Sequence, residues 1–233
     1  MLVINLTFPV FNEEAQIAAS LRRVTRFLAT QPQHAWELVV ANNGSRDRTL
    51  EQARAFAAEG VVPLRIRHRD QPGRGAALRE AWLGSDADVL SYLDIDLSTD
   101  LAHLPDLVGV VARGAADLAI GSRLSPASQT TRGWRRELLS RSYNGLLRGI
   151  LGLEVRDAQC GFKALSRAAA RALLPQVRDD GFFFDTELLV LAQRQGWRIR
   201  ELPVRWVDDP DSRVRILRTI WQDLRGICRL ALT

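Results

Sequence analysis

Short apolar runs alternate with segments of helical pattern along the first 121 residues, and this alternation restricts the fold more than any other feature. The predicted strands cover residues 2–8, 37–41, 64–68, 89–93 and 117–121, and a helix is predicted after each of the first four. A chain in which strands and helices alternate forms a parallel sheet with helices on both faces. The sequence therefore predicts an α/β fold with a largely parallel sheet flanked by helices.

Polar side chains follow three of these strands at the points where the strands end. Glu13 follows the first strand, Asn42 and Asn43 follow the second, and Asp94 and Asp96 follow the fourth. Parallel strands end along one edge of their sheet, and open α/β sheets bind ligands outside that edge. We therefore expect one binding site that draws on all three loops.

The sequence Asp94-Ile-Asp96 ends the fourth apolar strand with two carboxylates one residue apart. Such a pair suits a hard divalent cation, Mg²⁺ or Mn²⁺, that stays partly hydrated and is shared with a phosphate. The alternative is that both aspartates are turn residues before the next helix. Their expected position beside the two other polar loops favours the metal site.

The pattern changes after residue 124. Residues 125–131 predict a mobile polar loop, and an arginine-rich helix follows over residues 132–151. Further helices are predicted near residues 167–174 and from Phe182, a strand at 198–204, and a last helix from Val214. The second half is therefore expected to be mostly helical.

The last helix combines an apolar side with arginines. From Arg213 to the end there are five arginines and one aspartate, a net charge of +4. At helical spacing one side carries Val214, Leu217, Trp221, Leu224, Cys228 and Ala231. A basic amphipathic helix with a tryptophan on its apolar side is typical of a segment that lies on a membrane surface. The alternative is a terminal helix packed on the sheet with its arginines in water.

Charge and cysteine usage limit the classes of partner. The chain has 32 basic residues, 31 of them arginine, against 27 acidic ones, and its net charge of +5 allows anionic partners. No nucleic-acid recognition motif and no P-loop is recognisable, so we expect no nucleic-acid partner. Cys160 and Cys228 lack a metal-type spacing, which favours a reducing compartment. No apolar run is long enough to span a membrane and no signal peptide is recognisable, so we expect a cytoplasmic location.

Seven short motifs, in this order, resemble those of family 2 glycosyltransferases with a GT-A fold, and most of all the dolichyl- and polyprenyl-phosphate sugar synthases. The motifs are Pro9-Val-Phe-Asn-Glu13, Asn42-Asn-Gly-Ser-Arg-Asp47, Gly73-Arg-Gly-Ala-Ala77, Asp94-Ile-Asp96, Gly121-Ser-Arg123, Asp157-Ala-Gln-Cys-Gly-Phe-Lys163 and Phe184-Asp-Thr-Glu-Leu188. On this resemblance we expect a GT-A domain over residues 1–213, with a nucleotide-binding half (1–123) and an acceptor half (124–213). The basic amphipathic helix 214–233 follows.

The resemblance also implies roles for individual side chains. Nucleotide binding is implied for Pro9, Phe11, Glu13, Asn42, Asn43, Arg74 and Asp94. Metal ligation is implied for Asp94, Asp96 and Ser98, with Mg²⁺ or Mn²⁺ as the cofactor. Catalytic roles are implied for Asp96, Arg123, Asp157 and Arg213, and the two arginines are expected near phosphate.

Three positions depart from the family pattern. Asn42 and Asn43 stand where the family usually has two aspartates, and Ser98 stands where mannosyl-type relatives often carry a glutamine metal ligand. An amide both donates and accepts hydrogen bonds, which suits a uracil edge, although a guanine edge also offers a donor beside an acceptor. The run Cys-Gly-Phe-Lys163 is similar to the glucosyl branch. UDP-glucose is therefore the favoured donor, and GDP-mannose is the second.

The resemblance implies a metal-dependent inverting hexosyltransferase that moves a hexose from a nucleotide sugar to polyprenyl or dolichyl phosphate. Such an enzyme is expected to touch the cytoplasmic face of the membrane peripherally, and the sequence sets no oligomeric state. Two alternatives stay open. One is a family 2 transferase that acts on a hydroxyl of a sugar or another acceptor, with Asp157 as its base. The other is a catalytically inactive nucleotide-binding module.

Overall fold

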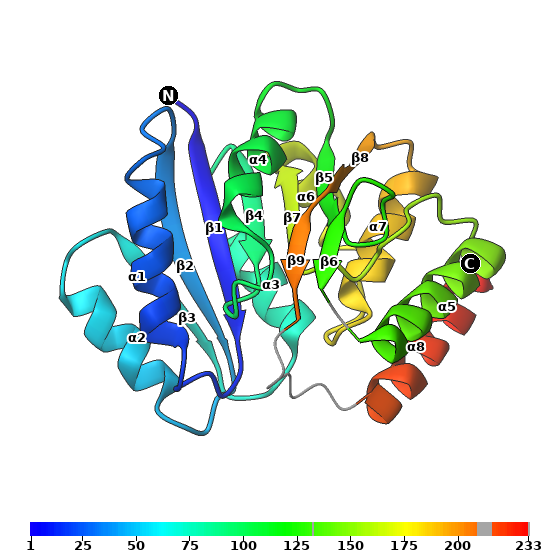
Figure 1. Ribbon diagram of the computed structural model, residues 1–233, viewed down its shortest axis with the longest axis horizontal. Coiled ribbons are helices and arrows are strands. Elements are labelled where there is room, and N and C mark those ends of the chain that lie inside the picture. The colour runs from blue at the N-terminus through cyan, green and yellow to red at the C-terminus, as the bar shows by residue number, and fades with distance from the viewer. Residues whose placement is uncertain (132, 209–215, 233) are drawn as a thin grey trace.

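A mixed seven-stranded sheet forms the centre of the computed structural model (Figure 1). The structure describes residues 1–131, 133–208 and 216–232, with the backbone alone for 216–222. The strand order is β3-β2-β1-β4-β7-β5-β8, and only the pairs of β7 are antiparallel. The predicted largely parallel sheet is confirmed, with these strand bounds: β1 Val3–Val10, β2 Ala35–Asn43, β3 Leu64–Arg69, β4 Val89–Leu93, β5 Leu118–Ser122, β7 Phe162–Ser166 and β8 Ile199–Pro203.

Helices cover both faces of this sheet, as predicted. One face carries α1 (Ile17–Leu28), α2 (Thr49–Ala58) and α4 (Leu104–Ala112), which follows the short 3₁₀ helix η1 (Leu101–His103). The other side carries α3 (Arg74–Leu83), α5 (Trp134–Leu151), α6 (Arg167–Leu173), α7 (Phe184–Arg194) and α8 (Ile216–Ala231). Helices α5 and α8 lie side by side at one end of the molecule (Figure 1).

Side-chain alternation along the central strands explains why both faces are covered. On β4, Val89 and Leu93 belong to the core under α1, α2 and α4, whereas Leu90 and Tyr92 belong to the core on the opposite face. Every residue of β4 is buried. A strand that is buried on both faces reads as a continuous apolar run, which is why the sequence located β4 correctly.

Helix α1 begins at Ile17 and not directly after Asn12, although asparagine is a common residue at a helix start. Asn12 does not cap it, because Asn12 has a left-handed backbone with φ of 58°. Its side-chain Oδ1 accepts a hydrogen bond from Arg46 N at 2.8 Å, and its own N–H donates to Ser45 Oγ at 3.0 Å. Asparagine tolerates this conformation better than most residues. Asn12 therefore ties the loop after β1 to the loop after β2.

Three short strands were not predicted. Strand β7 begins with the last two residues of the motif that ends at Lys163 and is inserted antiparallel between β4 and β5. Strand β6 (Gln129–Thr131) lies in the predicted mobile loop and pairs with β9 (Arg205–Val207) in a separate two-stranded sheet. All three depend on partners far away in the sequence, and such partners leave no periodic signal of their own.

Helix α8 packs on the protein through a side that the sequence did not single out. Asp223, Ile227 and Leu230 are buried, and the last two belong to the core shared with α5 and α7. Three residues of the predicted apolar side, Leu224, Cys228 and Ala231, are exposed. Arg213 and Val214 lie outside the described residues. Among the helices that the structure describes, none is both long and apolar enough to cross a membrane.

Candidate active site

The candidate site lies at the edge where β1 and β4 end, at the bottom of the sheet in Figure 1. Strands β2 and β3 extend the sheet on one side of β1, and β4 extends it on the other, so the strand order reverses here. This reversal is where open α/β sheets form their ligand crevice. Pro9, near the end of β1, pairs with Ala41 of β2 in the strand register and is partly buried.

Hydrogen bonds to one carboxylate, that of Asp47, fix the loops after β1 and β2 against each other. Asp47 accepts from the N–H of Thr49 at 3.0 Å and from the N–H of Glu14 at 3.2 Å. Glu13 N donates to Thr49 Oγ1 at 2.7 Å. Burial alone would raise the pKa of Asp47, but the hydrogen bond from the Thr49 hydroxyl, together with those from the backbone, holds the pKa below its ordinary value. Phe11 stays 42% exposed between the two loops, so its ring is available to a ligand.

Asn42 and Asn43 are both buried, and both side chains hold loops in place. Asn42 Oδ1 accepts from Ser45 N at 3.1 Å, and its Nδ2 lies 3.1 Å from His68 Nδ1. Asn43 Oδ1 accepts from the N–H of Gly73, the residue before α3. The two amides therefore shape the wall of the site and link β2 to the loop that introduces Arg74.

Asp94 and Asp96 follow β4 directly, and hydrogen bonds hold both carboxylates. Asp94 Oδ1 accepts from Arg74 Nη2 at 2.9 Å, and Asp94 N donates to Gly161 O at 3.1 Å. A Cβ at Gly161 would lie 1.7 Å from Asp94 Oδ2, so this position must be glycine for Asp94 to keep its place. Asp96 Oδ1 accepts from the backbone N–H of Ser98 at 2.9 Å. Both carboxylates are partly exposed.

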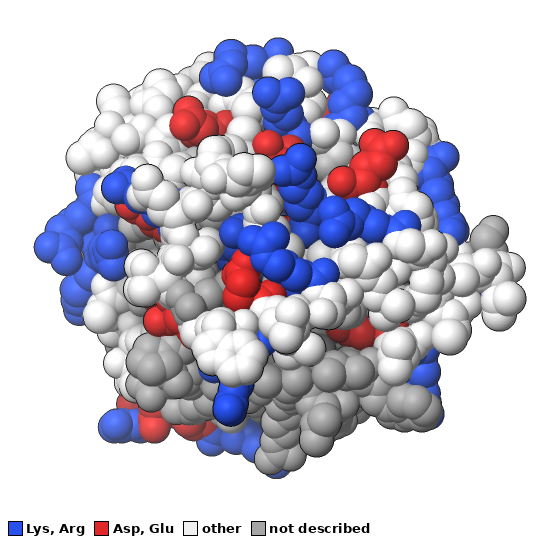
Figure 2. Space-filling model, turned by 45° about the vertical axis from the view of Figure 1, so that its right-hand side comes forward, with Lys and Arg blue, Asp and Glu red and all other residues white. Residues whose placement is uncertain are grey.

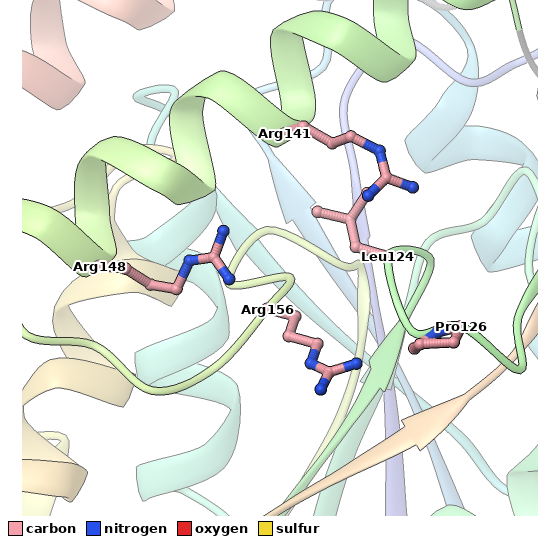
Figure 3. A pocket seen from close by; sticks show the side chains of 5 residues that line it. All are labelled: Leu124, Pro126, Arg141, Arg148 and Arg156. Carbon is pink, nitrogen blue, oxygen red and sulfur yellow. The ribbon is translucent and has the colours of Figure 1, made fainter.

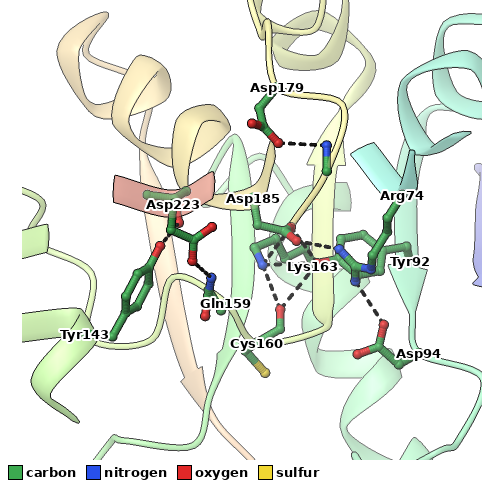
Figure 4. A network of polar contacts seen from close by, with 12 residues as sticks. Arg74, Tyr92, Asp94, Tyr143, Gln159, Cys160, Lys163, Asp179, Asp185 and Asp223 are labelled. Atoms are coloured by element: carbon green, nitrogen blue, oxygen red, sulfur yellow. Dashed lines mark hydrogen bonds and ion pairs between the residues drawn. The ribbon is translucent and has the colours of Figure 1, made fainter. Parts of the chain in front are cut away.

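Behind Asp94 lies a buried ionic cluster formed by Arg74, Tyr92, Lys163 and Asp185, which we call the Asp185 cluster (Figure 4). Asp185 accepts from Arg74 Nη1 at 2.6 Å, from Tyr92 OH at 2.5 Å and from Lys163 Nζ at 2.9 Å. Lys163 Nζ also donates to Cys160 O at 2.7 Å. The antiparallel pairing of β4 with β7 places Tyr92 directly opposite Lys163.

Charge compensation fixes the protonation states in this cluster. Burial alone would raise the pKa of Asp185, but Lys163 and Arg74 outweigh burial and hold the pKa below its ordinary value. Burial, followed by the charge of Asp185, raises the pKa of Tyr92 well above its ordinary value, so its hydroxyl stays protonated. Asp185 is therefore an anion that orients Arg74 toward Asp94, and Arg74 bridges the two carboxylates.

A second ion pair lies at the end of β5. Arg123 contacts Asp157 through two side-chain nitrogens, with Nε to Oδ2 at 2.7 Å and Nη2 to Oδ1 at 2.8 Å. The backbone N–H of Arg123 adds a third hydrogen bond at 2.9 Å, and its guanidinium lies 5.5 Å from the ring centre of Trp206. Asp157 is fully buried. Burial would raise its pKa, but Arg123 outweighs burial and holds the pKa below its ordinary value.

The structure thus brings together most of the side chains that the sequence selected. Pro9, Phe11 and Glu13 lie on the loop after β1, Asn42 and Asn43 at the end of β2, and Arg74 at the start of α3. Asp94, Asp96 and Ser98 follow β4. Arg123 follows β5 and pairs with Asp157, which comes after α5. The remaining selected residue, Arg213, is outside the described residues.

The sequence did not select Tyr92, Lys163 or Asp185 as site residues. Two features of the sequence pointed to Lys163 and Asp185. Lys163 is the single lysine in a chain with 31 arginines, and Asp185 lies in the motif Phe184–Leu188. A primary amine is compact and suits a site where one nitrogen contacts three oxygens, whereas a planar guanidinium does not. This geometry became visible only when β4, β7 and α7 came together.

Comparison with known proteins places the chain in a family. Residues 7–174 match the Glycosyl transferase family 2 domain. The chain is 42% identical over 234 residues to Glycosyltransferase AglD of Haloferax volcanii, with 94% of this chain and 37% of that protein covered. It is 31% identical over 223 residues to Dolichyl-phosphate beta-glucosyltransferase ALG5C of Trichomonas vaginalis, with 89% of this chain and 65% of that protein covered. The chain therefore spans only part of these relatives.

A solved structure shares the fold. Glucosyl-3-phosphoglycerate synthase of Mycobacterium tuberculosis, in complex with Mn²⁺, uridine diphosphate and phosphoglyceric acid, is similar with a TM-score of 0.73 and 22% identity, over 99% of this chain and 78% of that chain. The GT-A fold that the motifs implied is confirmed. With the family domain matched over residues 7–174 and its motifs gathered at one sheet edge, the chain belongs to glycosyl transferase family 2.

Proposed function

We propose that this chain transfers glucose from UDP-glucose to a polyprenyl or dolichyl phosphate, with inversion at the anomeric carbon. The similarity to dolichyl-phosphate beta-glucosyltransferases supports this choice. The observation that carries it is the Arg123–Asp157 pair, in which both carboxylate oxygens are bound to a guanidinium. A carboxylate held this way is a poor proton acceptor. An acceptor that is already anionic, such as a lipid monophosphate, needs no strong base.

The donor is proposed to bind against residues 1–123 and the acceptor against residues 124–213. The exposed ring of Phe11 provides an apolar face for the base, while Pro9, Glu13 and the buried amides of Asn42 and Asn43 fix the wall around it. The structurally similar synthase was solved with uridine diphosphate, which favours a uridine donor over a guanosine donor. GDP-mannose remains the second candidate.

Asp94 and Asp96 fit a Mg²⁺ or Mn²⁺ ion. Their partly exposed carboxylate oxygens are the ligands that hard cations prefer, and glycine at 161 leaves room for Asp94 Oδ2. Within the described residues no group of three or more His, Cys, Asp or Glu is arranged around one point. The ion would therefore take its other ligands from water, the diphosphate and, in our proposal, Ser98. When bound, it would neutralise charge on the leaving diphosphate.

Arginines complete the charge balance of the reaction. Arg74 is already oriented toward the diphosphate side, because its Nη1 lies 2.6 Å from Asp185 Oδ2 and its Nη2 lies 2.9 Å from Asp94 Oδ1. Arg123, with its side chain 16% exposed, faces the acceptor side in this proposal, and Arg213 is proposed as a second cation there. Fixed cations bring the acceptor phosphate and the donor together and stabilise the negative charge that grows on the leaving group.

The alternatives are less well supported by the geometry. A hydroxyl acceptor would require a base, and Asp157 is committed to Arg123. An inactive nucleotide-binding module would not need Asp94 to be connected to the Asp185 cluster through Arg74. Both alternatives make clear predictions, because the first gives sugar transfer without any lipid phosphate and the second gives no transfer at all.

We further propose that α5 and α8 touch the cytoplasmic surface of a membrane. Several large apolar side chains of α5 are exposed, including Trp134 at 71%, Leu138 at 59% and Ile150 at 49%. On the neighbouring α8, Leu224 and Cys228 are exposed. In Figure 2, basic side chains gather near the centre of this side of the molecule, beside a broad uncharged surface. Apolar and basic surface together are typical of contact with anionic leaflets.

A transfer assay with purified protein tests the proposed reaction. The donors are labelled UDP-glucose and GDP-mannose, and the acceptors are polyprenyl phosphate, the corresponding polyprenol and free glucose, each with Mg²⁺ or Mn²⁺. We expect label in the organic phase only with UDP-glucose and polyprenyl phosphate. Transfer to the free alcohol or to glucose would favour the hydroxyl-acceptor alternative, and faster transfer from GDP-mannose would reverse the donor assignment.

A further inference from the structure

A hollow of about 370 Å³ opens between α5 and the loop after β5 (Figure 3). Its lining residues are Leu124, Pro126, Arg141, Arg148 and Arg156. Arg141 and Arg148 come from α5, and Arg156 comes from the segment before Asp157. We call it the arginine hollow, because three of its five lining residues are arginine and none is acidic.

The cations of the arginine hollow are only partly neutralised by the protein. Arg141 pairs with Glu137 at 2.5 Å, on the same helix. Neither Arg148 nor Arg156 has an ion-pair partner in the part of the chain that the structure describes, and both are exposed. Two carboxylates lie near these groups: Glu137 pairs with Arg141, and Glu201 Oε1 accepts from the backbone N–H of Arg156 at 3.0 Å. Three guanidinium groups around one concave surface still outnumber them and leave a positive potential that an anion can neutralise.

The arginine hollow is separate from the Arg123–Asp157 pair, although the two are adjacent in sequence. Leu124 and Arg156 line the hollow, whereas their neighbours Arg123 and Asp157 bind each other. Arg156 is exposed, and Asp157 is fully buried. Neighbouring side chains therefore go to opposite sides of this segment, so an anion in the hollow would not replace Asp157 as the partner of Arg123.

The surroundings of the arginine hollow indicate what kind of anion it takes. Trp134, Arg141 and Arg148 are spaced seven residues apart along α5, so they lie on one side of the helix. Trp134 is 71% exposed, and Leu138, one turn further along, is 59% exposed. A soluble anion gains nothing from this apolar surface. A phospholipid carries a phosphate next to apolar chains, and tryptophan is enriched at the depth where the two meet.

We propose that the arginine hollow binds the phosphate of an anionic membrane phospholipid that is distinct from the acceptor. The bound lipid would hold α5 at the membrane surface while the acceptor phosphate is handled on the Arg123 side. This inference rests on the membrane contact proposed above, but it does not depend on the transfer reaction. A lipid-binding experiment and a transfer assay can therefore fail independently of each other.

Binding to vesicles tests the inference, with phosphatidylcholine vesicles that either contain or lack phosphatidylglycerol. The variant is Arg148→Gln/Arg156→Gln, and the matched control Arg23→Gln/Arg54→Gln removes the same charge from exposed positions on α1 and α2. We expect the hollow variant to bind phosphatidylglycerol vesicles on the order of twentyfold more weakly, about fivefold per arginine. The control should bind like the wild type. Equal losses in both variants would show that net charge alone matters and would overturn the inference.

A second comparison separates a defined site from diffuse attraction along the same helix. Arg148→Gln and Arg135→Gln both remove one exposed arginine of α5, but Arg135 lies outside the hollow. We expect the larger loss of affinity for Arg148→Gln. Equal losses would mean that the surface attracts lipid without a site. UDP binding to each variant, measured by calorimetry, checks that the fold is intact.

Two further arms identify the source of the phosphate. Inorganic phosphate presents the same group as the lipid, so its binding to the wild type without vesicles is measured by calorimetry. We expect it to be much weaker than binding to phosphatidylglycerol vesicles, and equal or tighter binding of inorganic phosphate would assign the hollow to a soluble anion. The last experiment measures binding of the hollow variant to vesicles in which polyprenyl phosphate is the only anionic lipid. A loss confined to those vesicles would assign the hollow to the acceptor and overturn the proposal. Lipid binding as expected, together with no transfer by the wild type, would reject the proposed reaction alone.

Discussion

Arginine is used in opposite ways in two regions of this molecule. At the sheet edge, Arg74 and Arg123 are largely buried and each contacts a carboxylate at 2.6–2.9 Å. In the arginine hollow, Arg148 and Arg156 are exposed, and their guanidinium groups have no carboxylate partner within the described residues. A buried charge must be paired, because an uncompensated ion away from water costs several kcal/mol. An exposed arginine keeps its hydration and can exchange water for the anion of a ligand. The first region is therefore a fixed framework, and the second is a surface for recruitment.

The largest effect on stability is expected from Asp185→Asn. This change leaves Lys163 and Arg74 buried with one anion fewer, and breaking a buried pair in this way costs about 3–5 kcal/mol. Urea unfolding of the variant measures the loss. Asp86→Asn is the matched control, because Asp86 is 94% exposed in its pair with Arg171 and should change stability by less than about 0.5 kcal/mol. Similar losses of unfolding free energy in the two variants would contradict the distinction between buried, paired charges and exposed ones.

Gly161→Ala should damage the site while sparing the fold. The added Cβ would meet Asp94 Oδ2, the end of a flexible side chain, so Asp94 can turn away at little cost in stability. It would then lose its contact with Arg74 and its position for a metal ion, and a displacement of this size costs on the order of a hundredfold in rate. Gly149→Ala, where a Cβ meets nothing within 4 Å, is the control and should keep its transfer rate.

Asp223 shows what happens to a buried carboxylate whose hydrogen-bonding neighbours, Tyr143 and Gln159, are neutral. Its Oδ2 accepts from Gln159 Nε2 at 3.1 Å, and burial raises its pKa from 3.8 to about 6. The folded state therefore favours the protonated form, and the stability that this provides is complete below pH 3.8 and is lost as pH rises through 6. In Asp157 and Asp185 the paired cations shift the pKa in the other direction.

Asp223→Asn, which stays neutral, should remove this dependence on pH. Relative to the wild type, the variant should become more stable by about 3 kcal/mol as pH rises from below 3.8 to above 6, at about 1.4 kcal/mol per pH unit between these values. Unfolding free energies from urea titrations at several pH values give the comparison. A constant difference over that range would mean that Asp223 does not titrate with a raised pKa in the folded protein.

The smallest effect on stability is expected in the arginine hollow. Arg148→Gln and Arg156→Gln remove exposed cations without breaking an ion pair among the described residues, so each should change the free energy of unfolding by less than about 0.5 kcal/mol. Arg123→Gln should cost several times more, because it leaves the fully buried Asp157 unpaired. A large loss of stability in the hollow variants would mean that Arg148 and Arg156 stabilise the fold as the buried arginines at the sheet edge do.

The sequence located the sheet edge well because that prediction rests on topology. Strand and helix alternate through the first half, and parallel strands must end together, so Asp94, Asn42 and Glu13 could be placed near each other without knowing any side-chain contact. Strand β7 was missed for the opposite reason. It pairs antiparallel with β4 and β5 across long separations in the sequence, and its first two residues are the last two of a motif that begins with a short loop.

The Asp185 cluster could not be predicted, because its members come from α3, β4, β7 and α7, and only the strand register brings Tyr92 opposite Lys163. The packed side of α8 was missed because Asp223 counts as polar in a periodic pattern, although here it is buried beside Gln159. In both cases the missing information is a contact between distant elements. Local periodicity carries no record of such contacts.

Calorimetry of UDP binding tests the central claim, that Asp94 and Asp96 hold a divalent cation against the donor diphosphate. Wild type and Asp96→Asn are each titrated with UDP in Mn²⁺ and in EDTA, and transfer from UDP-glucose is followed in parallel. We expect Mn²⁺ to tighten UDP binding at least about tenfold in the wild type and to have no effect in the folded Asp96→Asn variant. The transfer rate of this variant should fall by several orders of magnitude. Equal UDP affinity in Mn²⁺ and EDTA, with full transfer in EDTA, would contradict the central claim.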